Sequence, residues 1–197
     1  MNFLQRFLAD TRGVDTIPLK MVFYLSIAGI IILMTAFSWN NISPVVDDAH
    51  VDKQLEDVAL EISSIQNGYV RHISRNYIEG SMAVFDLSLP EHVKYISFGV
   101  DPDPDTNGDL TDTAWSVENN TIICSYSEGF KSRVLIDGEL IEFRKGMSNV
   151  GDDWIVDDNS SALGYDKGVV LEGPISGEFV FELVFVEGEG KYTLSHF

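Results

Sequence analysis

The feature that most constrains this chain is an apolar stretch of nineteen residues without a formal charge, residues 21–39. An α-helix of that length rises about 28 Å, close to the roughly 30 Å thickness of the hydrocarbon core of a bilayer. The stretch therefore predicts one transmembrane helix within residues 14–40, in contact with membrane lipid. No other stretch of the sequence approaches this length.

Charges on either side of the apolar stretch predict its orientation, because basic residues close to a span tend to stay on the cytoplasmic side. Arg6, Arg12 and Lys20 precede the span. Five acidic residues and a single lysine follow it within residues 47–57. We therefore expect a single-pass protein with a cytoplasmic N-terminus and with most of its chain exported to the cell surface.

The exported part is strongly anionic. It carries ten basic and twenty-nine acidic residues, a net charge of −19. Such a surface repels the phosphates of nucleic acid, so a nucleic-acid partner is excluded, and it attracts cations. Adaptation of the surface to a saline habitat would account for the same composition.

Past the span, apolar residues recur at heptad spacing, at Val51, Leu55, Val58, Ile62 and Ile65. This stripe, with polar residues between its members, predicts an amphipathic helix within residues 41–68 whose apolar edge needs a partner. The partner is the protein's own globular domain, other copies in an assembly, or both on different faces, and in a filament the stripe is expected to take part in assembly. Pro44 lies between the span and the stripe and is expected to kink or restart the helix.

From about residue 81 onward, the pattern changes to the alternation typical of β-strands. The Asp137-Gly138 pair predicts a two-residue hairpin between residues 133–136 and 139–143, and a Gly-rich turn predicts a second hairpin between 178–186 and 191–197. About seven strands favour an all-β, sandwich-like domain over residues 81–197, or a partly closed barrel. The predicted fold class is α+β. Cys124 is the single cysteine, so no intrachain disulfide is available, and it is expected to be buried in a strand.

The first thirteen residues form a short basic leader that ends in Arg12-Gly13, directly before Val14, and the uncharged apolar stretch begins at Met21. This arrangement resembles the class III signal peptide of archaeal type IV pilins, archaellins and pilin-like proteins. The resemblance implies cleavage between Gly13 and Val14, with the apolar helix retained as the core of a filament of identical or similar subunits. The chain departs from the bacterial pilin pattern at Pro18 and Lys20. An uncleaved membrane anchor is the alternative.

An acidic segment between two predicted strands is a candidate calcium loop. Carboxylate and amide oxygens alternate along it, and Gly108 permits the sharp turn that EF-hand-like loops need. The twelfth position is Ala114 where an EF-hand has a bidentate Glu, so a looser calcium site is predicted, with a solvated acidic turn as the alternative. The candidate ligands are Asp103, Asp105, Asn107, Asp109 and Asp112.

Two Asn-X-Ser/Thr motifs are candidate glycosylation sites in an exported domain, at Asn119 in an expected hairpin turn and at Asn159. The sequence has no Gly-rich phosphate loop, no metal-spaced His or Cys set and no Gly-X-Ser-X-Gly motif, so no enzyme is predicted. We therefore expect a major or minor structural subunit of an archaeal type IV pilus-like filament. The alternative is a membrane-tethered extracellular binding or adhesion module that does not polymerise.

Overall fold

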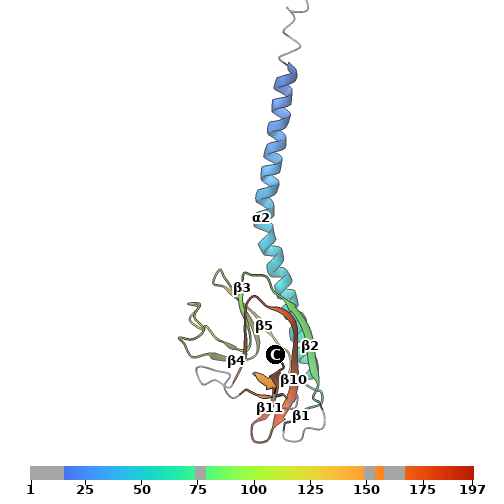
Figure 1. Ribbon diagram of the computed structural model, residues 1–197, viewed down its shortest axis with the longest axis vertical. Helices are drawn as coiled ribbons and strands as arrows, with labels where there is room; N and C mark the ends of the chain where they lie inside the picture. The colour runs from blue at the N-terminus through green and yellow to red at the C-terminus, as the bar shows by residue number, and fades with distance from the viewer. Residues whose placement is uncertain (1–15, 74–78, 149–153, 158–166) are drawn as a thin grey trace, which may run out of the picture. The chain divides into compact units, whose positions relative to one another are not determined.

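The computed structural model describes residues 16–73, 79–148, 154–157 and 167–197 (Figure 1). One long helix, α2 (Thr16–Ile65), precedes the strands. The strands of the described residues are β1 (Arg71–His72), β2 (Met82–Ser88), β3 (Val93–Asp101), β4 (Ser116–Tyr126), β5 (Lys131–Leu135), β6 (Glu142–Arg144), β7 (Gly146–Ser148), β8 (Trp154–Val156), β9 (Val169–Glu172), β10 (Ser176–Val186) and β11 (Gly190–Ser195). Over the described residues the chain is thus α+β, as predicted, with one N-terminal helix and a mostly β remainder.

The chain divides into two compact units, residues 1–48 and residues 49–197. Helix α2 contributes its apolar part to the first unit and the Val51–Ile65 stripe to the second. Pro44 is expected to kink or restart the helix, and the helix does not restart there, because the helical backbone continues through Pro44. A proline removes a single main-chain hydrogen bond of the helix, and the helical residues on both sides retain theirs.

The second unit, here called the β-domain, contains two main sheets. A five-stranded sheet has the order β1-β10-β11-β6, and β2 pairs with the first part of β10. A four-stranded sheet has the order β5-β4-β3-β9, and β7 and β8 form a separate pair. Most pairs are antiparallel, but β1 with β10 and β6 with β11 are parallel.

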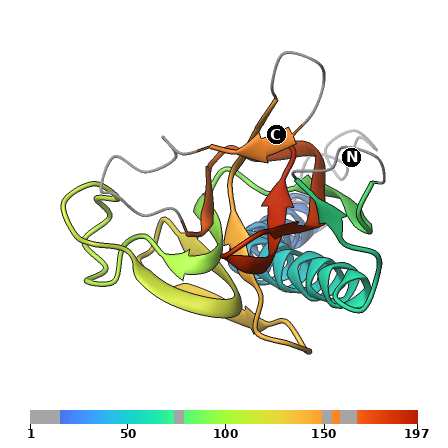
Figure 2. The same ribbon diagram turned by 90° about the horizontal axis from the view of Figure 1, so that it is seen from below.

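A single large hydrophobic core joins both main sheets to the C-terminal turns of α2. These turns lie beside β2 (Figures 1 and 2), where the Gln54 carboxamide exchanges two hydrogen bonds with the main chain of Ser88. Aromatic rings from different strands meet in the core, with Phe98 and Phe181 at 4.9 Å between ring centroids. Cys124 lies in β4 and is buried, as expected.

Of the two predicted hairpins, the one near the C-terminus is confirmed. Strands β10 and β11 are antiparallel, and their register runs from Phe181 opposite Ser195 to Val186 opposite Gly190. The prediction of a hairpin at Asp137-Gly138 is wrong. Strand β5 pairs with β4 in one sheet, whereas β6 pairs with β11 in the other, so residues 136–141 cross between the two sheets.

Contacts outside the dipeptide explain why residues 136–141 leave the first sheet. The Asn120 main-chain carbonyl accepts a hydrogen bond from Ile136, and its side chain accepts from the Ile141 amide and donates to the Glu139 carbonyl. Gly138 passes close to the end of α2, where a Cβ would lie 1.7 Å from the Gln66 side-chain oxygen. The glycine therefore permits close approach to the helix end rather than a tight hairpin turn.

Candidate functional sites

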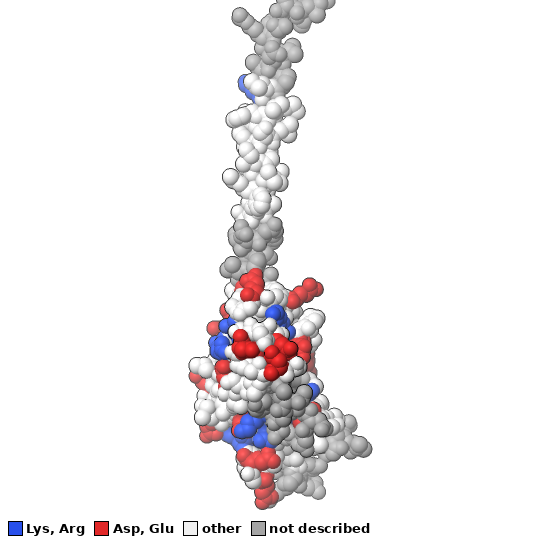
Figure 3. Space-filling view, turned by 90° about the vertical axis from the view of Figure 1, so that its left-hand side faces the viewer, with Lys and Arg blue, Asp and Glu red and all other residues white. Residues whose placement is uncertain are grey.

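The apolar part of α2 is the first candidate site. Twenty residues, Leu19–Ser38, form a helix long and apolar enough by length and composition to cross a membrane, properties that a signal sequence shares. None of this window is buried within the chain. The hydroxyls of Ser26 and Thr35 donate to the carbonyls of Val22 and Ile31, which satisfies these two donors within the helix itself. Figure 3 shows this part of the helix free of charged side chains beyond Lys20 at its N-terminal end.

The Val51–Ile65 stripe has a different environment. Its five residues, Val51, Leu55, Val58, Ile62 and Ile65, are each 6% exposed or less and belong to the core of the β-domain. The stripe therefore packs on the protein's own domain, the first of the predicted alternatives, and these side chains are not exposed for contact with another copy. The stripe residues and apolar residues of both main sheets bury one another in this core. Leu60, on another face of the same helix, is 67% exposed.

Four other predicted positions are the two residues of the processing site and the two glycosylation sites. Gly13 and Val14, the predicted processing site, and Asn159 lie outside the described residues. Asn119 is exposed, but it lies within β4 rather than in a hairpin turn. Strand β4 is irregular at this point, because Ile122 pairs with Phe98 and Val117 pairs with Val100, which leaves four residues of β4 against one residue of β3. Asn120 adopts a positive φ of 56° within it.

The predicted calcium ligands lie in the loop between β3 and β4, residues 102–115, here called the acidic loop. Asp103 is buried, and its two carboxylate oxygens accept hydrogen bonds from the main-chain amides of Asn107 and Gly108, at 2.9 and 3.1 Å. Asp103 therefore holds the turn of the loop through its own carboxylate.

The remaining acidic side chains also find donors within the loop. The Asn107 side-chain amide donates to Asp105 and Asp112, at 3.0 and 2.6 Å. Asp109 accepts from the hydroxyl and the main-chain amide of Thr111, and these two bonds lower the pKa of the Asp109 carboxyl. Among the described residues, no group of three or more His, Cys, Asp or Glu side chains is arranged to hold a metal ion. Calcium binding by this loop stays a prediction.

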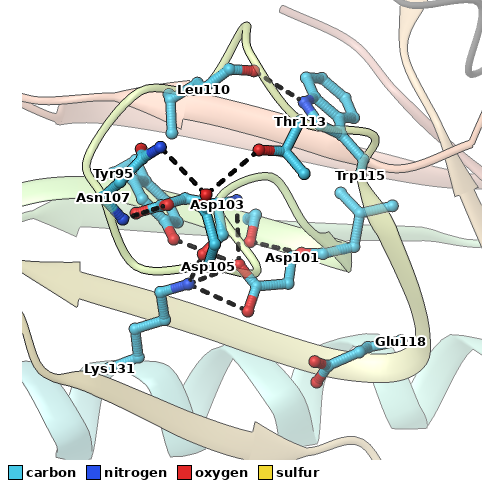
Figure 4. A network of polar contacts seen from close by, with 12 residues as sticks. Tyr95, Asp101, Asp103, Asp105, Asn107, Leu110, Thr113, Trp115, Glu118 and Lys131 are labelled. Carbon is cyan, nitrogen blue, oxygen red and sulfur yellow. Dashed lines mark hydrogen bonds and ion pairs between the residues drawn. The ribbon is translucent and has the colours of Figure 1, made fainter.

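A buried ion cluster lies at the base of the acidic loop (Figure 4). The Lys131 ammonium, on β5, donates to both carboxylate oxygens of Asp101, at 2.8 and 3.1 Å, and to the main-chain carbonyl of Asp103. Both side chains of the ion pair are nearly inaccessible, with exposures of 5% for Lys131 and 3% for Asp101. Arg133 adds a second cation 2.9 Å from Asp101.

Tyr95 completes this cluster from β3. Its hydroxyl lies 3.4 Å from an Asp101 oxygen. Burial, and after it the charge of Asp101, raises the pKa of Tyr95 well above its ordinary value, so the ring stays neutral. The result is a carboxylate surrounded by donors, with Lys131 as its most buried cation.

A second buried carboxylate, Glu182, lies on β10. Arg71 binds both of its oxygens, at 2.7 and 2.6 Å, the Gly80 amide donates at 2.7 Å, and His196 Nε2 lies 3.0 Å away. Trp154 stacks flat on the His196 ring, with 4.7 Å between centroids, and its carbonyl accepts from Arg71. Glu182 thus connects the segment around Arg71 and Gly80 to β8.

Sequence reasoning missed both buried clusters. A signal for Glu182 is present, because it is the only charged residue among residues 179–185 of an otherwise apolar strand. A charge in such a strand is buried only when it is paired. Asp101 and Lys131 are thirty positions apart in the sequence, so no local pattern joins them.

Comparison of the chain with protein-family models, with curated proteins and with solved structures finds no match. The features that bear on its function are therefore those of the chain itself, an exposed apolar helix and a strongly acidic β-domain.

Proposed function

We propose that this chain is a structural subunit of an archaeal type IV pilus-like surface filament, anchored in the cell membrane by the apolar part of α2 before assembly. The observation that carries the proposal is the exposure of the Leu19–Ser38 segment, with Phe23, Ile32 and Phe37 each more than 60% exposed. Burying one such side chain is worth about 1.5–3 kcal/mol. This surface needs lipid or other apolar helices around it.

The two parts of α2 differ in burial, and this difference supports assembly through the N-terminal part of the helix. The Val51–Ile65 stripe is used within the β-domain, so the Leu19–Ser38 segment is the long apolar surface that remains available for contacts between copies. In a filament, these helices would bury one another, and the acidic, sandwich-like β-domains would stay hydrated on the outside. The leader that ends in Arg12-Gly13 carries the cleavage site for the processing that precedes such assembly.

The mature N-terminus tests this proposal. Mass spectrometry of protein extracted from the membrane of the native host should show Val14 as the first residue. The substitution Gly13→Val should block processing, because a peptidase site that accepts a very small residue before the cut excludes a branched one. Gly29→Val is the matched control, since a Cβ at Gly29 meets no atom within 4 Å, and it should be processed normally. Mature protein that begins at Met1 would overturn the pilin-like function.

One observation favours a second candidate function, a membrane-tethered extracellular binding module. An open groove of about 590 Å³ lies beside the acidic loop, and its walls carry Glu91, Lys94 and Glu172 with the apolar side chains of Leu110 and Pro174. Cavities of this size hold small ligands. An intact N-terminus, together with a protein that stays monomeric in the membrane, would favour this function over the filament.

A further inference from the structure

We propose that the Lys131 ammonium is the cation around which the acidic loop folds, so that the loop is ordered by a charge of the protein itself. This inference concerns the β-domain alone and is independent of the proposed filament function. It follows from the oxygen atoms that accept hydrogen bonds from Lys131 and from the hydrogen bonds that connect these oxygens to the rest of the loop.

Three oxygens of the loop base converge on the ammonium. Two belong to the Asp101 carboxylate, and the third is the main-chain carbonyl of Asp103. Carboxylate and carbonyl oxygens are also the ligands that hard cations take in proteins. An ammonium has three donors, and here each of the three oxygens receives one contact. A buried charge is stable only when it is paired, so Lys131 and Asp101 hold each other in place.

The order of the loop depends on this pair through a short series of contacts. Asp101 accepts a hydrogen bond from the Asp103 amide, at 3.1 Å, which places the Asp103 carboxylate inside the loop. That carboxylate then receives the amides of Asn107 and Gly108. Without Lys131, the half-exposed Arg133 would be the remaining cation at Asp101, and the repulsion between the two buried carboxylates would be less well compensated.

Lys94 provides a matched control for Lys131. It is an exposed lysine on β3, and its ammonium lies near the same loop, 3.3 Å from the place where a Cβ at Gly108 would be. Replacing either lysine by Met removes one positive charge close to the acidic loop. Only Lys131→Met removes the buried cation beneath it.

The test uses the full chain in detergent. In Lys131→Met, limited proteolysis should cut within residues 102–115 roughly tenfold or more faster than in the unsubstituted protein, because cleavage follows the population of the opened loop. Lys94→Met should be cut at the rate of the unsubstituted protein. The double variant Lys131→Met, Asp101→Asn should regain part of the melting temperature lost in Lys131→Met, because the buried side chain that has lost its Lys131 partner is then neutral.

The unsubstituted protein provides a readout that does not depend on any variant. Millimolar calcium should change its melting temperature no more than magnesium at equal ionic strength, because the loop base already holds its cation. A larger shift with calcium, or equal cleavage of the loop in Lys131→Met and Lys94→Met, would overturn the inference. If Lys131→Met does not fold, the double variant Lys131→Met, Asp101→Asn takes its place in the cleavage comparison with Lys94→Met, and equal cleavage would overturn the inference.

Discussion

At the scale of single residues, the β-domain depends on buried charges that are fully surrounded by donors. Glu182 shows how hydrogen bonds compensate for the burial of a charge. Burial alone would raise the pKa of its carboxyl, but the hydrogen bonds from His196, Arg71 and the Gly80 amide outweigh burial and lower the pKa from 4.5 to about 2. The folded protein therefore stabilises the ionised form of the Glu182 carboxyl.

The depressed pKa of Glu182 predicts how stability depends on pH. Because the folded-state pKa lies below the unfolded value, the contribution of Glu182 is fully present above about pH 4.5 and is lost as the pH falls toward 2. A shift of this size corresponds to on the order of 3 kcal/mol. Glu182→Gln should therefore lower the free energy of unfolding at pH 7 by a similar amount and should flatten the acid limb of the stability curve.

Denaturant unfolding between pH 7 and pH 3 measures both effects. The control is Glu178→Gln, an exposed glutamate on the same strand, which should leave stability at pH 7 nearly unchanged. Equal losses in the two variants would show that the Glu182 cluster makes no special contribution.

Asn120 is the second residue whose side chain decides local structure. Asn120→Ala would leave the Ile141 amide and the Glu139 carbonyl without their side-chain partner, and alanine tolerates the positive φ of 56° poorly. We expect a loss of about 2–3 kcal/mol in the free energy of unfolding. Asn119→Ala, at the exposed neighbouring position, should change it by less than about 0.5 kcal/mol.

Chemical denaturation of protein made in a host that does not glycosylate keeps the Asn119 comparison free of sugar effects. If both alanine variants lose the same stability, the crossing of residues 136–141 is held by something other than the Asn120 side chain.

At the scale of elements, one helix carries two kinds of apolar surface. The Leu19–Ser38 segment is apolar on all sides and exposed, which is typical of a helix that lies in lipid or among other apolar helices. The Val51–Ile65 stripe is narrow and buried in the β-domain. Heptad spacing alone does not distinguish a helix that pairs with another copy from one that packs on a sheet, because both need one narrow apolar edge.

The core role of the stripe predicts the effect of shortening its side chains. Leu55 is fully buried, so Leu55→Ala should lower the free energy of unfolding of the β-domain by about 3 kcal/mol, within the usual 2–5 kcal/mol range. Leu60→Ala, on the exposed side of the same helix, should have an effect below about 0.5 kcal/mol. Thermal or denaturant unfolding of both variants checks this. A stripe that served contacts between copies would instead make the Leu55 variant defective in assembly and normal in stability.

At the scale of the whole molecule, the boundary between the two compact units falls between residues 48 and 49 of the sequence, within helix α2. The β-domain includes the stripe as part of its core, and its single cysteine is buried in β4. A fragment of residues 49–197 therefore contains a complete core of its own, whereas a fragment of residues 81–197 lacks the helix and β1.

These fragments give a prediction for the molecule as a whole. Residues 49–197 should be soluble and fold cooperatively, with a far-ultraviolet spectrum dominated by β-structure and a minor helical part. Residues 81–197 should aggregate or remain unfolded, because the sheets would expose the surface that the stripe covers. Circular dichroism and size-exclusion chromatography distinguish these outcomes. A folded, monomeric 81–197 fragment would show that the helix is not needed for the core.

The sequence by itself determined the parts of this protein that local pattern specifies. A long apolar stretch predicts the helix, alternation of apolar and polar residues predicts most of the strands, and the Gly-rich turn predicts the β10–β11 hairpin, because each depends on neighbouring residues. The exposed apolar helix of the candidate function belongs to this group.

The tertiary structure alone decided which surfaces the elements cover and which charges meet. The stripe packs in the core of its own domain. The Asp137-Gly138 segment crosses between the two main sheets, and Asp101 forms an ion pair with Lys131 of another strand. Each of these outcomes depends on residues far apart in the chain. The physical reason is that burial and charge pairing act through space, so their partners are set by the assembled sheets rather than by spacing along the sequence.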